Sequence, residues 1–364
     1  MFTLFLCGDV MTGRGVDQIL RHPSKAELRE SYVRYATQYV QLAEQVSGPI
    51  PRGVDGRYIW GDALEELARI GPDVRIANLE TAVTQSDDFW PKRINYRMHP
   101  ANVDCLTAAG LHVCTLANNH VMDFGYAGLI ETVDTLTRAG IHVAGAGRDS
   151  EEATQPARRG LAGGGHLLVF SFGCENAGVP PSWVPDAHRP GLAMLEDLSE
   201  ATAASVLSRV AVAKCPGDLV IVSIHWGSNW GYAVPRKHVR FARWLVDGGV
   251  DLVHGHSSHH ARPIEVYRDR LILYGCGDLI TDYEGIPGEE TYRPELVLMY
   301  FVTLAASGRL ERVRLTPMRS RRLRLNRAPV ADAVWLAQRL GRMGARYGTR
   351  LEVAADGTLE LRWN

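Results

Sequence analysis

The sequence lacks any apolar run long enough to cross a membrane, and neither sign of charge is in excess. None of its apolar stretches approaches the roughly 20 residues that a transmembrane helix needs. It has 40 Lys and Arg against 41 Asp and Glu, which gives a formal net charge of -1. Proteins that bind nucleic acid through phosphate contacts usually carry a basic excess. We therefore expect neither a nucleic-acid partner nor an integral membrane segment.

Cysteine is scarce, and its spacing excludes a disulfide framework. The six cysteines form no Cys-x-x-Cys pair, and several lie in apolar segments, as expected of buried thiols in a reducing compartment. Residues 1–7 are apolar, but they have no basic residues before them and continue directly into Gly8-Asp9. This pattern indicates a first β-strand rather than a signal peptide. The sequence therefore predicts a cytoplasmic protein.

The sequence does contain many short apolar strands that alternate with amphipathic helical segments, which is typical of an α/β protein. Residues 22–56 interrupt this alternation, and we expect an insertion there, a helix followed by a loop over the site. In the last part of the chain, a helical pattern over residues 331–347 precedes a hairpin about Asp356-Gly357. We expect residues 316–364 to form a small helix-hairpin appendage packed on a catalytic domain of residues 1–315.

Side chains that commonly bind metals recur where the predicted strands end. They are Asp9, Glu80, Asn119 with His120, His225, and His256 with His259. In α/β sheets, ligands bind at the carboxyl ends of strands, and His is the commonest protein ligand of transition metals. Five such junctions predict a site for one or two divalent ions, and the many imidazoles favour Mn, Zn or Fe. Either His259 or the adjacent His260 is the last ligand.

The same motifs, taken in order, resemble those of the capsule-synthesis CapA (PGA_cap) family, which is similar to the calcineurin-like metallophosphoesterases. They are Gly8-Asp9, Asn78-Leu79-Glu80, residues 117–123, His225-Trp226-Gly227 and residues 255–259. The resemblance spans about residues 2–315 and implies a metallophosphatase-like two-sheet β-sandwich flanked by helices. Met11 stands where the wider superfamily has a His, and Glu80 stands where it has the bridging Asp.

The resemblance also implies roles for individual residues. Asp9, Glu80, Asn119, His225, His256 and His259 would hold the metals, with Glu80 as the bridge. His120 and Asp123 would form an acid/base pair, in which Asp123 orients the imidazole. Arg14 and Arg97 are predicted to bind an anionic substrate as bidentate donors, and Asp278 is a further candidate for substrate binding.

These residues favour a metal-dependent hydrolase that cleaves a phosphoester or amide bond in an anionic small molecule or peptide. A metal-dependent peptide epimerase or isomerase fits the same residues, because metals that clamp a carboxylate acidify its α-proton. A non-enzymatic, polyanion-binding accessory protein of capsule assembly is the third possibility. The sequence does not indicate the oligomeric state.

Overall fold

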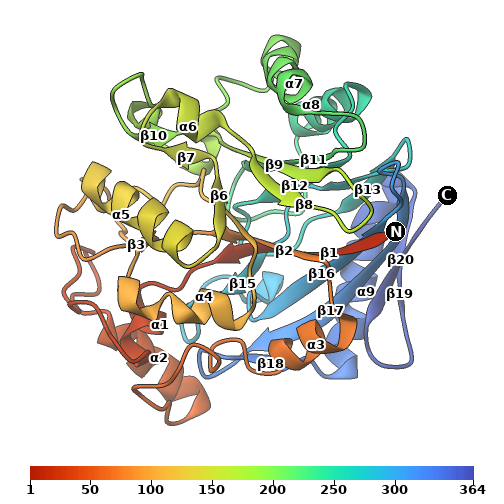
Figure 1. The fold of residues 1–364 in the computed structure, drawn as a ribbon. Coiled ribbons are helices and arrows are strands. Elements are labelled where there is room, and N and C mark those ends of the chain that lie inside the picture. Colours follow the sequence, from red (N-terminus) through yellow and green to blue (C-terminus); the bar gives the residue numbers. More distant parts are fainter.

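The computed structural model describes residues 1–364 and contains two large β-sheets that pack face to face (Figure 1). The first sheet has ten strands, and its main order is β19 (Thr349–Val353), β20 (Leu359–Trp363), β17 (Leu310–Ser320), β16 (Leu296–Leu304), β1 (Phe2–Val10), β2 (Val74–Leu79), β5 (Val113–Thr115), β6 (His142–Ala144). Two more strands pair at its side, β15 (Asp278–Ile280) with β1 and β18 (Leu325–Arg327) with β17.

The second sheet has six strands, in the order β13 (Ile264–Tyr267), β14 (Arg270–Leu273), β12 (Leu252–His256), β11 (Leu219–His225), β9 (His166–Gly173), β8 (Ala157–Gly160). Strands β9, β11, β12 and β14 run parallel, so their carboxyl ends lie at one edge. Residues of both sheets share one buried apolar cluster, which includes Leu4 and Ile76 of the first sheet and Ile221 and Leu252 of the second. The predicted two-sheet sandwich is therefore confirmed.

Helices cover the outer faces of the two sheets. Those on the first sheet are α1 (Arg14–Ile19), α2 (Thr37–Ser47), α3 (Ala63–Ile70), α4 (Asp104–Ala108) and α5 (Gly125–Arg138). Helices α7 (Glu200–Ala213) and α8 (Arg236–Asp247) pack on the second sheet. Helix α6 (Ser150–Thr154) lies beside a two-stranded sheet of β7 (Ala146–Gly147) and β10 (Gly191–Leu192), and β3 (Ala82–Val83) pairs with β4 (Arg97–Met98).

Side chains of strand β1 point alternately to the two faces of the sheet, and both faces are buried. Leu4 and Leu6 belong to the apolar cluster between the sheets, whereas Phe5 and Cys7 belong to the cluster under the helices. A β-bulge follows, because the register between β1 and β2 shifts between Cys7 and Asp9. The bulge reverses the alternation and turns Asp9 towards the second sheet.

The C-terminal segment continues the first sheet. The predicted boundary after residue 315 falls inside β17, and β20 pairs with β17 at Arg314 and Leu315. Helix α9 (Val330–Gly344) contacts β17 of the first sheet and β13 of the second, and its Leu336 and Leu340 join the cluster between the sheets. The helix and hairpin therefore complete the sandwich core, and they are not an appendage on its surface.

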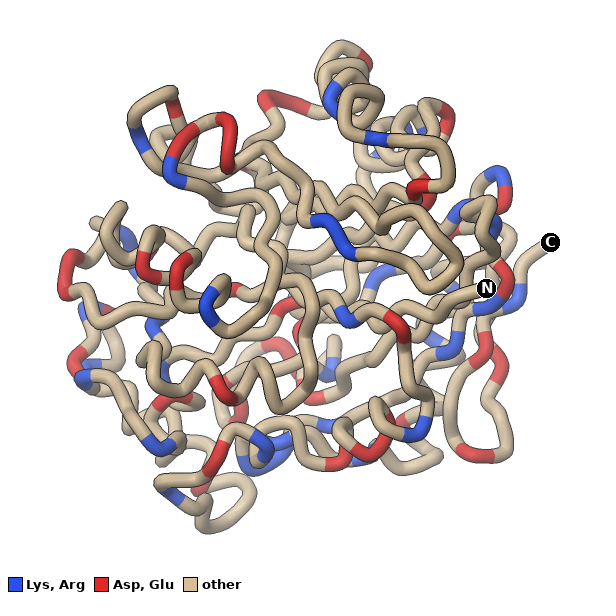
Figure 2. Tube along the Cα trace, viewed as in Figure 1, with Lys and Arg blue, Asp and Glu red and all other residues tan.

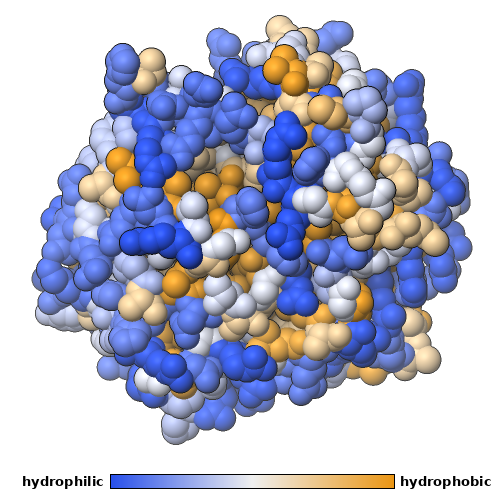
Figure 3. All heavy atoms as spheres, viewed as in Figure 1, coloured by the Kyte–Doolittle hydropathy of each residue, from blue (hydrophilic) through white to orange (hydrophobic).

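The surface is polar and mixed in charge. Lys and Arg alternate with Asp and Glu along the trace (Figure 2), and on the face in Figure 3 the apolar residues gather mainly in recesses between hydrophilic ones. No helix has both the length and the apolar character that a bilayer crossing requires. In the insertion at residues 22–56 the predicted helix is α2, and the predicted loop follows it at residues 48–56. A loop at residues 22–36 precedes the helix and was not predicted.

Candidate metal centre

The predicted strand-end residues lie together where the carboxyl ends of strands from both sheets meet. Asp9 is next to the end of β1, and Glu80 directly follows β2. His225 and His256 are the last residues of β11 and β12 in the second sheet. All four side chains are buried, with at most 3% of their surface exposed. Each sheet therefore contributes part of one enclosed donor set.

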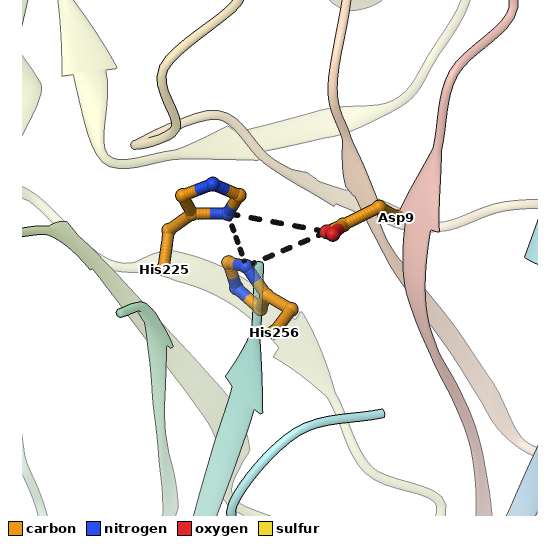
Figure 4. Close-up of side chains that lie close together, drawn as sticks. All are labelled: Asp9, His225 and His256. Carbon is orange, nitrogen blue, oxygen red and sulfur yellow. Dashed lines mark hydrogen bonds and ion pairs between the residues drawn. The ribbon is translucent and has the colours of Figure 1, made fainter. Parts of the chain in front are cut away.

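Three donor atoms from this set converge on one point (Figure 4). Nδ1 of His225 and Nδ1 of His256 are 2.9 Å apart, and Oδ1 of Asp9 lies 3.9 Å and 3.7 Å from them. A divalent ion with four ligand bonds of about 2.1 Å keeps its ligands about 3.4 Å apart. The three observed separations bracket this value, so the donors fit a single ion with little movement.

A second group consists of carboxylates. One oxygen each of Asp9, Glu80 and Asp278 lies within 4.8 Å of the others, and all three residues are buried. Oε2 of Glu80 and Oδ2 of Asp278 accept no hydrogen bond although they are buried. Buried acceptors without a partner are rare in native proteins. Asp278, which was predicted to contact substrate, therefore faces the other carboxylates as a candidate ligand.

The shifts in the pKa values of these side chains are those expected of metal ligands without a bound cation. Burial, and then the neighbouring Asp278, raises the pKa of Asp9 to about 8. Burial together with Asp9 and Asp278 also raises the pKa of Glu80, while burial lowers the pKa values of His225 and His256. Without a cation, the carboxyl groups retain protons and the imidazoles stay neutral. Metal binding to such ligands replaces protons.

Asp9 is held in place from two directions. The side-chain amide of Asn78 donates to Oδ1 at 2.7 Å, and the backbone N–H of Ser257 donates to Oδ2 at 3.1 Å. Ser257 has a φ of +95°, a backbone conformation that costs energy for any residue with a Cβ. Strain of this kind is typical of functional sites. At Ser257, the strained conformation directs the backbone N–H at the carboxylate of Asp9.

The predicted acid/base pair also meets. Nδ1 of His120 is 2.7 Å from Oδ2 of Asp123, and the ring of Tyr96 stacks on the imidazole with centroids 3.8 Å apart. Lys92, which was not predicted, places Nζ 2.6 Å from Oδ1 of Asp123. Burial, and then the charge of Lys92, lowers the pKa of His120 to about 4, although Asp123 opposes the shift. The imidazole is therefore neutral at pH 7.

His120 of this pair lines a cavity of about 470 Å³, while Asp123 is buried behind it. Residues that line it include Glu80, Asn119, His120, His225 and His259 from the strand ends, and Tyr32, Lys92, Arg93, Tyr96, Trp230 and Tyr283 from the loops. Oδ1 of Asn119 is buried without a hydrogen-bond donor, as expected of an atom that awaits a ligand. The size and the mixed lining suit a small molecule or the end of a peptide.

The two arginines predicted to bind substrate have other partners. Arg97 does not line the cavity, because its guanidinium donates to the carbonyl of Ser86 at 2.7 Å and to Asp87 at 2.9 Å. Arg14 lines the cavity, but its guanidinium is paired with Asp282 at 2.5 Å and with Glu30 at 3.1 Å. Arg97 therefore lies outside the cavity, and Arg14 faces the cavity with its guanidinium already paired.

Arg93 is the cavity-lining arginine that remains available. Its side chain is exposed and forms no ion pair. It lies in the loop that also carries Arg97, only four residues away, and local sequence does not distinguish the two. The difference lies in the partners of Arg97, Ser86 and Asp87, which precede it by 11 and 10 residues.

The choice between the last two histidines follows from their neighbours. Nδ1 of His259 is 3.1 Å from Oδ1 of Asp278, and His259 lines the cavity. His260 instead stacks on Tyr292, with centroids 4.7 Å apart, and contacts Tyr232. The geometry therefore favours His259 as the residue that serves the site.

The fold and this site define a two-sheet α/β protein with a buried histidine and carboxylate centre at its strand ends. The chain belongs to the bacterial capsule synthesis protein PGA_cap family, whose model matches residues 3–283. The resemblance predicted from the motifs is thus confirmed.

Relatives that match this chain are named for polyglutamine synthesis or for capsule biosynthesis. A probable polyglutamine synthesis accessory protein of Mycobacterium tuberculosis is 49% identical over 362 residues, which are 99% of this chain and 95% of the relative. The capsule biosynthesis protein CapA of Bacillus anthracis is 26% identical over 77% of this chain and 60% of its own. A solved 5′-nucleotidase precursor of Thermus thermophilus aligns over 87% of this chain and 54% of its own, with 14% identity and a TM-score of 0.47.

Proposed function

We propose that this chain is a divalent-metal-dependent hydrolase that cleaves a phosphoester or amide bond in an anionic substrate of capsule or polyglutamate synthesis. The convergence of Asp9, His225 and His256 within reach of one ion is the observation that carries the proposal. In this proposal Glu80 would bridge two ions, Asp278 would help to hold the second one, and Asn119 and His259 would complete the donor set. The mixed nitrogen and oxygen donors suit Mn, Zn or Fe.

The residues of the chain itself would handle the protons and the substrate. When bound, divalent ions supply a nucleophile at neutral pH and polarise the electrophile. Nδ1–H of His120 donates to Asp123, so Nε2 is free to take a proton from the attacking water and to pass it to the leaving group. Lys92 pairs with the other oxygen of Asp123 at 2.6 Å and holds this carboxylate beside His120. Arg93 would bind the anionic part of the substrate.

A metal-dependent epimerase or isomerase is the second candidate, and the neutral state of His120 favours it. An unprotonated Nε2 is able to remove an α-proton from a substrate whose carboxylate is clamped beside it. Incubation in heavy water separates the two reactions. Exchange at a substrate Cα without cleavage supports the isomerase, and cleavage without exchange supports the hydrolase.

Metal content tests the proposal before a substrate is known. The protein is purified without chelator or histidine tag, and bound metals are counted by mass spectrometry in the wild type, in His256→Ala and in His260→Ala. His260 is a matched control, because it is buried nearby but packs on aromatic rings. We expect one or two ions in the wild type and the control, and fewer in His256→Ala.

Activity is then screened on phosphoesters and γ-glutamyl peptides, with His120→Ala as the inactive variant that keeps its metal. The hydrolase proposal is contradicted if the wild-type protein contains no metal and if both the wild type and His256→Ala bind poly-gamma-glutamate. That result favours the polyanion-binding accessory role.

A further inference from the structure

A chain of hydrogen bonds behind His256 determines which of its ring nitrogens faces the candidate metal position. It runs from the carbonyl oxygen of Cys7 through His254 and Ser223 to Nε2 of His256, and all four residues are buried. We infer that Ser223 and His254 are positioning residues that hold His256 in the Nε2-protonated tautomer. Nδ1 then presents its lone pair to the cation. This inference rests on the metal centre of the proposed function.

The order of the protons follows from what each group is able to donate. The carbonyl of Cys7 only accepts, so Nε2 of His254 must carry a proton and donate to it at 2.9 Å. His254 is buried and has no carboxylate partner, so it is neutral and its Nδ1 is an acceptor. Ser223 therefore donates its hydroxyl proton to Nδ1 of His254 at 3.0 Å.

Ser223 has one proton, and this bond uses it. Its oxygen therefore accepts from Nε2–H of His256 at 2.9 Å. The only other contact of the hydroxyl, with Oγ1 of Thr115 at 3.4 Å, is too long to compete. Nδ1 of His256 is left unprotonated and accepts from Nδ1–H of His225 at 2.9 Å. For both Nδ1 atoms to face a cation, that single proton would move to Nε2 of His225, which lies 3.7 Å from Oε1 of Glu80.

Ser171 provides a matched control for Ser223. It lies opposite Ser223 on the neighbouring strand β9, is also buried, and its hydroxyl has no hydrogen-bond partner. Ser223→Ala removes the acceptor of His256, whereas Ser171→Ala makes the same chemical change without touching the chain of hydrogen bonds. We expect about 10- to 100-fold weaker metal binding for Ser223→Ala, as is typical when a residue that orients a ligand is lost, and less than a twofold change for Ser171→Ala.

A second readout needs neither metal nor substrate. Long-range ¹H–¹⁵N correlation spectra of the metal-free wild type should show His256 protonated at Nε2. In His254→Leu, the Ser223 hydroxyl is free to donate to His256, so the other tautomer should appear. A wild-type His256 protonated at Nδ1, or equal metal affinity in both serine variants, overturns the inference. If no catalytic activity is found, the proposed hydrolase fails while both readouts still test the tautomer.

A separate feature, a hollow beside α8, points to an anion-binding site away from the metal centre. The hollow has a volume of about 730 Å³ and is lined by Val234, Arg236, Val239, Arg240, Arg243, Arg346 and Tyr347. It contains no acidic residue, and of its four arginines only Arg243 has an ion-pair partner, Glu265. Arg236 and Arg240 lie one helical turn apart, where like charges destabilise a helix.

We propose that this hollow binds clustered phosphate groups, presented either by anionic lipid headgroups or by a free polyphosphate. A phosphate group offers up to two negative charges and several acceptor oxygens, so one group satisfies more than one guanidinium, and arginine binds phosphate in a bidentate manner. Bound phosphate would also relieve the repulsion between Arg236 and Arg240.

Vesicle sedimentation and calorimetry test this proposal. The protein is mixed with phosphatidylglycerol or phosphatidylcholine vesicles and, separately, with tripolyphosphate. The variants are Arg240→Ala/Arg346→Ala and a control, Arg57→Ala/Arg209→Ala, whose arginines are exposed and unpaired elsewhere. We expect at least a tenfold loss of binding in the first variant only. If the protein binds phosphatidylglycerol vesicles but not tripolyphosphate, the ligand of the hollow is a lipid headgroup. If it binds tripolyphosphate, and tripolyphosphate releases it from the vesicles, the ligand is a soluble polyphosphate. No binding to either, or equal loss in both variants, refutes the site.

Discussion

Gly8→Ala should damage both the stability of the protein and its metal centre, because Gly8 forms the bulge that turns Asp9 towards the second sheet. A Cβ added at Gly8 would lie 1.8 Å from the carbonyl oxygen of Gly277. Carbon and oxygen atoms that are not bonded approach to about 3.3 Å at closest. The backbone segments at Gly8 and Gly277 would therefore have to separate by about 1.5 Å.

The cost follows from what this separation breaks. The backbone N–H of Asp9 donates to the same carbonyl of Gly277 at 3.1 Å, and a further 1.5 Å of separation abolishes this bond. Leaving a buried backbone group unsatisfied costs about 1–3 kcal/mol. Overpacking a core adds about 1–3 kcal/mol. Together these terms give an expected loss of about 2–6 kcal/mol, a large part of the 5–15 kcal/mol that is typical of a native protein.

Urea unfolding, followed by circular dichroism, measures the change in the free energy of unfolding, and mass spectrometry measures the bound metal in the folded fraction. Gly160→Ala is the control, since an added Cβ there meets no atom within 4 Å. Its stability should stay within about 0.5 kcal/mol of the wild type. A Gly8→Ala protein that is as stable as this control and holds as much metal would falsify the reasoning.

Three further predictions concern charged groups. Because the pKa of Asp9 is raised to about 8, protons compete with metal below that pH, and metal affinity measured by calorimetry should fall about tenfold per pH unit from pH 8 to pH 6. The same raised pKa means that the free energy of unfolding of the metal-free protein should decline as the pH rises towards 8. Lys92→Met should raise the pKa of His120 above about 4, observed by NMR titration, because the charge of Lys92 lowers it; an unchanged pKa contradicts this. Arg97→Ala should lower the free energy of unfolding by about 1–3 kcal/mol without changing metal content, whereas Arg93→Ala should leave stability unchanged and raise KM for an anionic substrate. The opposite pattern would restore Arg97 as the substrate ligand.

The donor set at the strand ends was predictable because its signal is local. An apolar run that ends in a carboxylate or an imidazole marks the edge of a buried strand, and parallel strands bring such ends together. This is why Asp9, Glu80, His225 and His256 were found without knowing the strand order. The two-sheet architecture was implied by the family resemblance that the same ordered motifs carry.

What could not be predicted depends on contacts between distant residues. Arg97 and Arg93 look alike in the sequence, but the guanidinium of Arg97 is engaged by Asp87 and by backbone carbonyls, including that of Lys25. Ser223 and His254 lie inside apolar strands. The local sequence there does not show that their side chains form hydrogen bonds with residues of neighbouring strands. Residues 22–56 combine helical spacing with turn residues, and this local pattern does not show that a loop precedes α2, the helix that contacts α1.

The site is assembled from the two ends of a long stretch of chain, which has a consequence for biosynthesis. Asp9 leaves the ribosome about 270 residues before Asp278 does, and His225 and His256 also emerge late. At ordinary rates of translation this delay is on the order of 15–50 s. During that time β1 is able to pair with β2 and β5, but the nascent chain has no imidazoles to share an ion with Asp9. In the proposed function, metal binding would therefore be a late event, and a polypeptide released before the second sheet is complete would carry no ion.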